Sequence, residues 1–200
     1  PTTFDELLST GKKLKSGDVA GVAMRSKADG TAGSWPGGGF VFSNGGVIIQ
    51  DGKCMLDSPE AIEAIHYYGT ILKEAGPLGV GNYHWYECLN DYMQEVCGIG
   101  MDSSNFATDI ENPEKSNAAG HTTYGAMVSG PGKQAKPNMW HWMAGINSKS
   151  QQKAAAFLFL TWANSKPTCL MSSALGLATT RTSAWESDGF KSAFGKQAAT

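Results

Sequence analysis

Tryptophan side chains beside neutral polar groups are the feature of this sequence that most directly suggests binding chemistry. Residues 139–146 alternate as a strand would, which predicts that Trp140 and Trp142 lie on one face. A single tryptophan is typical of a buried core, but two on one face of a short strand favour a binding surface. Trp35 and Trp85 lie in other segments of mixed aromatic and polar character. Flat indole rings with N–H donors suit the C–H faces of a sugar or polyol.

Polar side chains follow two of the predicted strands. The segment Asp102-Ser103-Ser104-Asn105 comes directly after a predicted strand at residues 96–101, and Arg25 ends another at residues 19–24. Ligands of α/β sheets bind at the carboxyl ends of strands, where carboxylate, hydroxyl and guanidinium groups can bond sugar hydroxyls. The alternatives are an ordinary helix N-cap for the Asp102 segment and a surface salt bridge for Arg25.

Signatures of catalysis are weak by comparison. No G-x-S-x-G motif is present, and nothing evident near Cys88 lowers the pKa of its thiol. The turn at residues 130–134 lacks the leading glycine and the final Ser or Thr of a phosphate-binding loop. Glu87 and Asp102 can supply the paired carboxylates of a glycoside hydrolase, and this enzyme class is the alternative to a binding function.

Cysteine and histidine spacing matches no common metal site. The four cysteines contain no C-x-x-C pair, and the four histidines contain no H-E-x-x-H motif. We therefore expect no metal and no other cofactor. Disulfide bonds are possible in an exported protein, but four cysteines allow three pairings and the sequence does not choose among them. These cysteines are Cys54, Cys88, Cys97 and Cys169.

Low charge and the lack of long apolar runs exclude two classes of partner. Charged residues make up 17% of the chain and its net charge is -2, which offers no field to hold a nucleic acid. The longest apolar run, residues 154–160, is far shorter than the roughly 20 residues of a membrane-spanning helix, so we expect no direct membrane insertion. A length of 200 residues is consistent with one large domain or one and a half.

Capping signals define the expected helices. Thr3-Phe4-Asp5-Glu6 is a capping box ahead of a helix over residues 4–14. Ser58 and Pro59 begin the clearest helix, residues 59–75. Its expected apolar stripe consists of Ala61, Ile62, Ile65, Tyr68, Gly69 and Leu72.

Further helices and strands complete an alternating order. Residues 25–46 hold seven glycines and predict a loop followed by a short irregular helix. Ser148-Lys149-Ser150-Gln151 is a second capping box, and residues 154–162 after it predict a deeply buried helix. The remaining expectations are helices at residues 86–94 and from 183–186 onward, and strands at residues 122–128 and 139–146. Strands interleaved with helices predict an α/β fold.

Several motifs, taken in their order along the chain, match one family. They include Gly21-Val22-Ala23-Met24-Arg25, Leu56-Asp57-Ser58-Pro59-Glu60-Ala61, Met101-Asp102-Ser103-Ser104, Gly145-Ile146-Asn147-Ser148 and Thr180-Arg181-Thr182-Ser183. Each is weak alone, but as an ordered set they cover nearly the whole sequence. The chain resembles the extracellular solute-binding proteins of bacterial ABC importers, in the family that takes up sugars and polyols.

The resemblance implies a periplasmic-binding-protein-like architecture, in which two α/β lobes, each a sheet flanked by helices, close on a ligand in the cleft between them. Family members are longer, so the chain is expected to be a fragment with a partial two-lobe architecture. Residues 1–139 are expected to form most of the second, C-terminal lobe. Residues 140–200 are expected to form the hinge crossing and a partial segment of the first lobe with its return.

The resemblance also implies a function. It predicts a receptor, not an enzyme, that reversibly captures a sugar or polyol and delivers it to the permease subunits in the membrane. The implied location is periplasmic or extracellular, with a cell-surface lipoprotein as one form. The residues expected to face the cleft are Arg25, Trp35, Trp85, Asp102, Ser104, Trp140, Trp142 and Arg181.

Overall fold

The computed structural model describes residues 1–177 and 179–195, and it divides the chain into two compact units. The first unit is Pro1–Met139 and the second is Trp140–Thr200. Helices and parallel strands alternate in the first unit, which confirms the predicted α/β class. Among the described residues, no helix has both the length and the apolar character needed to cross a membrane.

A two-stranded parallel sheet forms the centre of the first unit. Strand β1 (Ala20–Met24) pairs with β4 (Cys97–Met101), in a register that places Met24 opposite Met101. Both strands begin and end within a residue of their predicted bounds. All five residues of β1 are buried, so the strand is covered on both faces.

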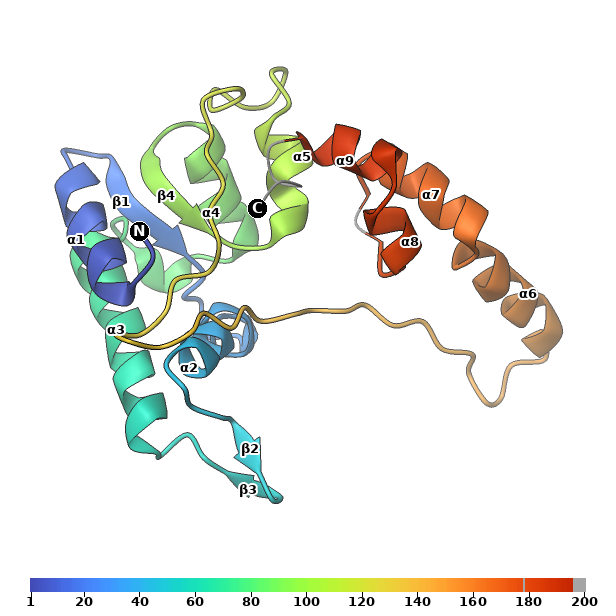
Figure 1. The fold of residues 1–200 in the computed structure, drawn as a ribbon, viewed down its shortest axis with the longest axis horizontal. Helices are drawn as coiled ribbons and strands as arrows, with labels where there is room; N and C mark the ends of the chain where they lie inside the picture. The colour runs from blue at the N-terminus through green and yellow to red at the C-terminus, as the bar shows by residue number, and fades with distance from the viewer. Residues whose placement is uncertain (178, 196–200) are drawn as a thin grey trace. The chain divides into compact units, whose positions relative to one another are not determined.

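Helices α1 (Phe4–Leu14) and α3 (Pro59–Ala75) cover one face of the sheet, and α4 (Trp85–Met93) covers the other (Figure 1). Val22 and Met24 belong to the core cluster that includes α1 and α3. Ala23 instead joins a second cluster with Cys88 of α4. The sheet is therefore flanked by helices, as predicted.

The predicted caps explain where α1 and α3 begin. The Thr3 hydroxyl accepts from the Glu6 amide at 3.2 Å, and the Ser58 hydroxyl accepts from the Ala61 amide at 3.3 Å. Pro59 occupies the first turn of α3, where its missing N–H leaves no bond unmade.

The buried face of α3 differs from the predicted stripe. Ala61, Ala64, Ile71 and Ala75 are fully buried, whereas Ile62 and Ile65 are 56% and 49% exposed. Close packing is one reason: a Cβ added at Gly11 of α1 would lie 2.9 Å from the Ala75 Cβ, so α3 requires a small side chain at Ala75.

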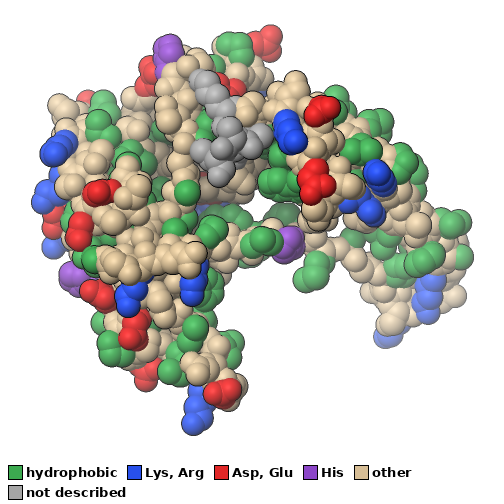
Figure 2. Space-filling model, viewed as in Figure 1, with side chains coloured by type: hydrophobic (Ala, Val, Ile, Leu, Met, Phe, Trp, Pro, Cys, Tyr) green, Lys and Arg blue, Asp and Glu red, His purple; other side chains and the backbone are tan. Residues whose placement is uncertain are grey.

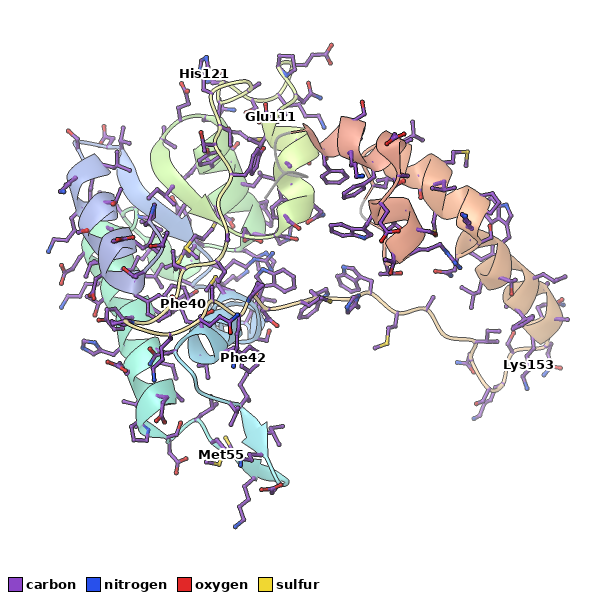
Figure 3. The ribbon with its side chains drawn as sticks, viewed as in Figure 1. Phe40, Phe42, Met55, Glu111, His121 and Lys153 are labelled. Carbon is purple, nitrogen blue, oxygen red and sulfur yellow. The ribbon has the colours of Figure 1, made fainter. Side chains whose placement is uncertain are left out.

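The glycine-rich segment forms a π-helical turn, η1 (Gly33–Gly37), that continues into α2 (Gly38–Ser43). This agrees with the predicted loop and irregular helix. Phe40 of α2, which Figure 3 labels, stacks on Phe4 of α1 with ring centroids 4.6 Å apart, and this contact fixes the segment to the core.

Short elements complete the first unit. Strands β2 (Ile49–Gln50) and β3 (Lys53–Cys54) form a hairpin whose turn residues Asp51 and Gly52 have φ of 51° and 75°. The others are η2 (Val80–Asn82), η3 (Ser104–Phe106) and α5 (Ala107–Ile110).

The strands predicted at residues 122–128 and 139–146 do not form. Both segments lack regular secondary structure apart from isolated bridging near residue 129. A strand needs a neighbour to satisfy its backbone groups, and these segments pair with no strand among the described residues. Alternation of apolar residues alone did not distinguish an extended segment from a strand.

Helices are the regular secondary structure in the described residues of the second unit, and they begin after residues 140–152, which are not helical. The unit contains α6 (Lys153–Ala163), α7 (Lys166–Ala174), α8 (Thr182–Trp185) and α9 (Asp188–Phe194). The capping box predicted at Ser148 is wrong, because Asn147 and Ser150 accept from the Lys149 and Gln152 amides and form turns instead.

Helix α6 is exposed, although the sequence predicts that it is deeply buried. Phe157, Leu158, Phe159 and Trp162 are between 57% and 68% exposed, and the helix has no buried residue. Apolar side chains surround α6, and Figure 2 shows such side chains uncovered on the surface of the molecule. The prediction was wrong because no described element of the second unit covers this helix on all sides.

Candidate ligand-binding site

Arg25 and Asp102 meet at the carboxyl edge of the parallel sheet. Because Met24 pairs with Met101, the residues that follow them leave adjacent strands at the same edge. Arg25 Nε donates to Asp102 Oδ2 at 2.7 Å, and Arg25 Nη2 donates to Asp102 Oδ1 at 2.6 Å. The pair is therefore bidentate, the geometry in which a guanidinium and a carboxylate bind most strongly.

This ion pair is almost fully buried and its carboxylate is well satisfied. The side chains of Arg25 and Asp102 are only 12% and 9% exposed. Asp102 Oδ1 also accepts from the Ser103 amide at 2.6 Å. The two charges cancel within one polar unit, so the edge of the sheet offers hydrogen-bonding groups without net charge.

Trp35 lies against the same arginine. The Arg25 guanidinium carbon is 5.4 Å from the centroid of the Trp35 ring, within the range of a cation–π contact. The Asn138 side-chain amide donates to the carbonyls of Ser34 and Trp35 at 2.6 and 3.0 Å. These bonds hold the π-helical turn that carries the indole.

Trp85 and Ser104 belong to neighbouring elements of the first unit. Trp85 begins α4 and stacks on Phe106 of η3, with centroids 5.4 Å apart and an interplanar angle of 24°. Ser104 begins the same turn, two residues after Asp102. Trp85 remains 38% exposed, so its indole is available at the surface.

Two residues at this site were missed by sequence reasoning. Phe106 is the stacking partner of Trp85, and its place just after the polar segment 102–105 was the one signal that could have indicated it. Tyr68 of α3 donates its hydroxyl to the backbone carbonyl of Arg25. It was predicted only as part of an apolar stripe, and no local pattern reveals a bond to a residue 43 positions away.

Three predicted site residues lie in the second unit. Trp140 and Trp142 contact each other edge to face, with centroids 6.0 Å apart, in an extended segment. The Arg181 guanidinium donates to the Asn164 carbonyl at 2.7 Å, beside a cavity of about 340 Å³ lined also by Cys169, Thr180 and Thr182. That these three residues share one cleft with Arg25 stays a prediction.

Glu87 and Asp102 both serve structural bonds. Glu87 Oε2 accepts from the His84 amide at 2.8 Å and caps α4, while Asp102 is held by Arg25. A glycoside hydrolase needs two carboxyl groups that face a common sugar, whereas both of these carboxylates are committed to bonds within the protein.

All four cysteines are free thiols, and only Cys54 is exposed. Burial raises the pKa of Cys97 to about 12 and raises that of Cys88 as well, so neither is a reactive thiolate. Across the described residues, no group of three or more His, Cys, Asp or Glu side chains could hold a metal ion.

The sheet edge with its neutralised ion pair and its aromatic rings is typical of a site that binds a polar, uncharged molecule. A family model described as bacterial extracellular solute-binding protein matches residues 1–168. The chain belongs to this family.

Relatives support the assignment. An erythritol/L-threitol-binding protein of Mycolicibacterium smegmatis is 26% identical over 111 residues, which are 56% of this chain and 23% of the relative. The structure of an Agrobacterium radiobacter K84 solute-binding protein in complex with ribitol matches with a TM-score of 0.86 and 25% identity. A maltose-bound T. maritima protein matches with a TM-score of 0.87 and 21% identity.

The extent of these matches is uneven. The chain is covered almost completely by the two solved structures, at 98% and 100%, but spans only 51% and 52% of their lengths. It spans about a quarter of the curated relative.

Proposed function

We propose that this chain acts as the solute-binding component of an ABC importer, capturing a neutral sugar or polyol reversibly and delivering it to the membrane permease. The proposed residues are those expected from the sequence, with Arg25, Trp35, Trp85, Asp102 and Ser104 from the first unit. Trp140, Trp142 and Arg181 would add contacts from the second unit.

The observation that carries the proposal is the buried Arg25–Asp102 pair beside Trp35. Arg25 has five N–H groups, and two of them donate to Asp102. The others supply donors for ligand hydroxyls, while Trp35 offers an aromatic ring to C–H groups. Because the pair is neutral as a unit, it favours an uncharged ligand: a charged ligand would lose its hydration without gaining an opposite charge.

The named relatives point to the same class of solute. Erythritol, L-threitol and ribitol are all neutral polyols, and maltose is a neutral sugar. Receptors of this kind break no bond. A ligand that contacts both lobes shifts an equilibrium between open and closed forms by its differential affinity, and the permease would recognise the closed form. A periplasmic or extracellular location follows from this role, with lipid anchoring at the cell surface as one form.

Intrinsic tryptophan fluorescence, titrated with ribitol, erythritol and maltose, tests the proposal. We expect a saturable change with at least one of these solutes and none with glycine or Ca²⁺. Arg25→Gln should weaken binding at least about tenfold, because it removes the fork of donors. Lys12→Gln is the matched control: it also removes one positive charge, but from an exposed pair with Glu74 at 2.6 Å. A response confined to the amino acid or the metal ion would contradict the proposal.

The glycoside hydrolase using Glu87 and Asp102 is tested separately. If the protein releases nitrophenol from aryl glycosides and Asp102→Asn abolishes this release, the result would contradict the receptor function and support the enzyme. We expect no turnover, because both carboxylates are engaged in structural bonds.

A further inference from the structure

Tyr68 lies on α3, a helix that carries none of the expected ligand contacts, yet it touches Arg25 and also α2, the helix that follows the turn with Trp35. Its hydroxyl donates to the backbone carbonyl of Arg25, at the end of β1. Its ring packs edge to face with the ring of Phe40 of α2, with centroids 5.2 Å apart and an interplanar angle of 73°. Helix α2 continues directly from the turn that holds Trp35.

We propose that Tyr68 is a positioning residue, which fixes Arg25 and Trp35 relative to each other so that the guanidinium stays in its bidentate bond with Asp102. The inference rests on the proposed function for its meaning, since the positioned group is the one that would bind the ligand. Tyr68 itself does not contact the ligand in this scheme.

The geometry explains why such a residue is needed. Arg25 is the first residue after β1, so its carbonyl has left the ladder of bonds with β4. A carbonyl at that point needs another donor, and the Tyr68 hydroxyl supplies it. Burial raises the pKa of Tyr68 above its ordinary value, so the hydroxyl remains a neutral donor. The aromatic contact with Phe40, which stacks in turn on Phe4, prevents the ring from moving away.

The adjacent residue offers a matched control. Tyr67 also lies on α3 and packs its ring on Phe4, with centroids 5.3 Å apart. Its hydroxyl donates to Asp5 Oδ1 at 3.0 Å, an exposed group of α1 that is not part of the site. Tyr68→Phe and Tyr67→Phe therefore remove the same atom from neighbouring positions, but only the first breaks a bond to Arg25.

Nuclear magnetic resonance of the 200-residue chain can observe the effect directly. The sequence contains two arginines, Arg25 and Arg181, so two Nε–H signals are expected. In Tyr68→Phe, the Arg25 Nε–H should exchange with water about tenfold faster, because its bond to Asp102 opens more often. The Arg181 signal should stay unchanged, and Tyr67→Phe should leave both signals as in the wild type.

A ligand titration separates this inference from the proposed function. If the wild type binds ribitol, Tyr68→Phe should bind it about tenfold more weakly and Tyr67→Phe equally well. If the wild type binds none of the polyols and sugars, the proposed function fails. The rate at which the Arg25 Nε–H exchanges with water still tests whether Tyr68 positions Arg25.

Unchanged Arg25 exchange in a folded Tyr68→Phe protein would overturn the inference. Should this variant fail to fold, the wild type supplies a second measurement. The Tyr68 hydroxyl proton is bonded to a buried carbonyl, so it should exchange with water slowly and give an observable resonance. This resonance should show a cross-peak to backbone protons next to the Arg25 carbonyl. A missing resonance or cross-peak would also overturn the inference.

Discussion

The two ion pairs Arg25–Asp102 and Lys12–Glu74 have the same N–O distance of 2.6 Å, but their environments differ. The first is 12% and 9% exposed, and the second is 55% and 39% exposed. Exposed pairs are screened by water and salt, whereas breaking a buried pair leaves one charge without a partner in a poorly solvated place. Burial rather than distance therefore decides which pair matters for stability.

Asp102→Asn should consequently lower the free energy of unfolding by about 3 kcal/mol, because it strands the Arg25 charge. Glu74→Gln, the matched change in the exposed pair, should alter it little. Urea unfolding followed by circular dichroism measures both. Equal effects of the two substitutions would mean that the buried pair is solvated in solution.

At the scale of elements, a close approach of backbones sets the position of α1 on the sheet. A Cβ added at Gly21 of β1 would lie 1.8 Å from the carbonyl oxygen of Gly11 in α1. No flexible side chain can yield at this contact, because the atom approached belongs to the backbone. The strand and the helix can meet only where both residues lack a side chain.

Gly21→Ala should therefore destabilise the protein by about 3 kcal/mol or more, since the helix must move off the strand. Gly69→Ala is the control: Gly69 lies on the exposed face of α3, where an added Cβ meets nothing within 4 Å. That substitution should stabilise by roughly 0.5–1 kcal/mol through helix propensity. Thermal unfolding of both variants measures the difference, and a tolerated Gly21→Ala would show that α1 is not held at this distance.

Local signals predicted the elements that local bonds determine. The caps at Thr3 and Ser58 and the breaks around β1 were enough to give α1, α3 and β1 nearly to the residue. The strands expected at residues 122–128 and 139–146 failed because pairing depends on a neighbour that the segment itself does not encode. The bond between Arg25 and Asp102 could not be predicted either, because it also depends on strand pairing. The two residues are 77 positions apart and meet only through the register of two strands. The sequence predicts both as groups that bind ligand hydroxyls, with a surface salt bridge as the alternative for Arg25, and the structure shows that Arg25 forms an ion pair that is buried.

On the scale of the whole molecule, the two units differ in how they bury apolar groups. Both core clusters consist of residues from Pro1–Met139. In the second unit, α6 carries four large apolar side chains that are more than half exposed: Phe157, Leu158, Phe159 and Trp162. The solved relatives have about twice the length that this chain spans, so their folds contain segments that these 200 residues do not match.

Residues 1–139 alone should therefore fold cooperatively and keep the Arg25 Nε–H signal of the longer chain. The 200-residue chain should in addition bind the dye anilinonaphthalene sulfonate, and residues 1–139 should bind much less of it, because the exposed side chains of α6 are absent. Dye fluorescence and thermal unfolding of the two chains measure this. Loss of cooperative unfolding in residues 1–139 would show that the second unit is needed for the core.

The low solvent exposure of the Arg25–Asp102 pair also determines how the site responds to salt concentration. Mobile ions screen charges at a water-exposed surface, with a Debye length of about 8 Å at physiological ionic strength, but they enter a nearly closed, internally neutralised pair very little. The proposed capture of an uncharged solute at this edge should therefore have the same affinity at low and at high salt concentration. A protein facing an environment whose salinity it does not control would benefit from that constancy.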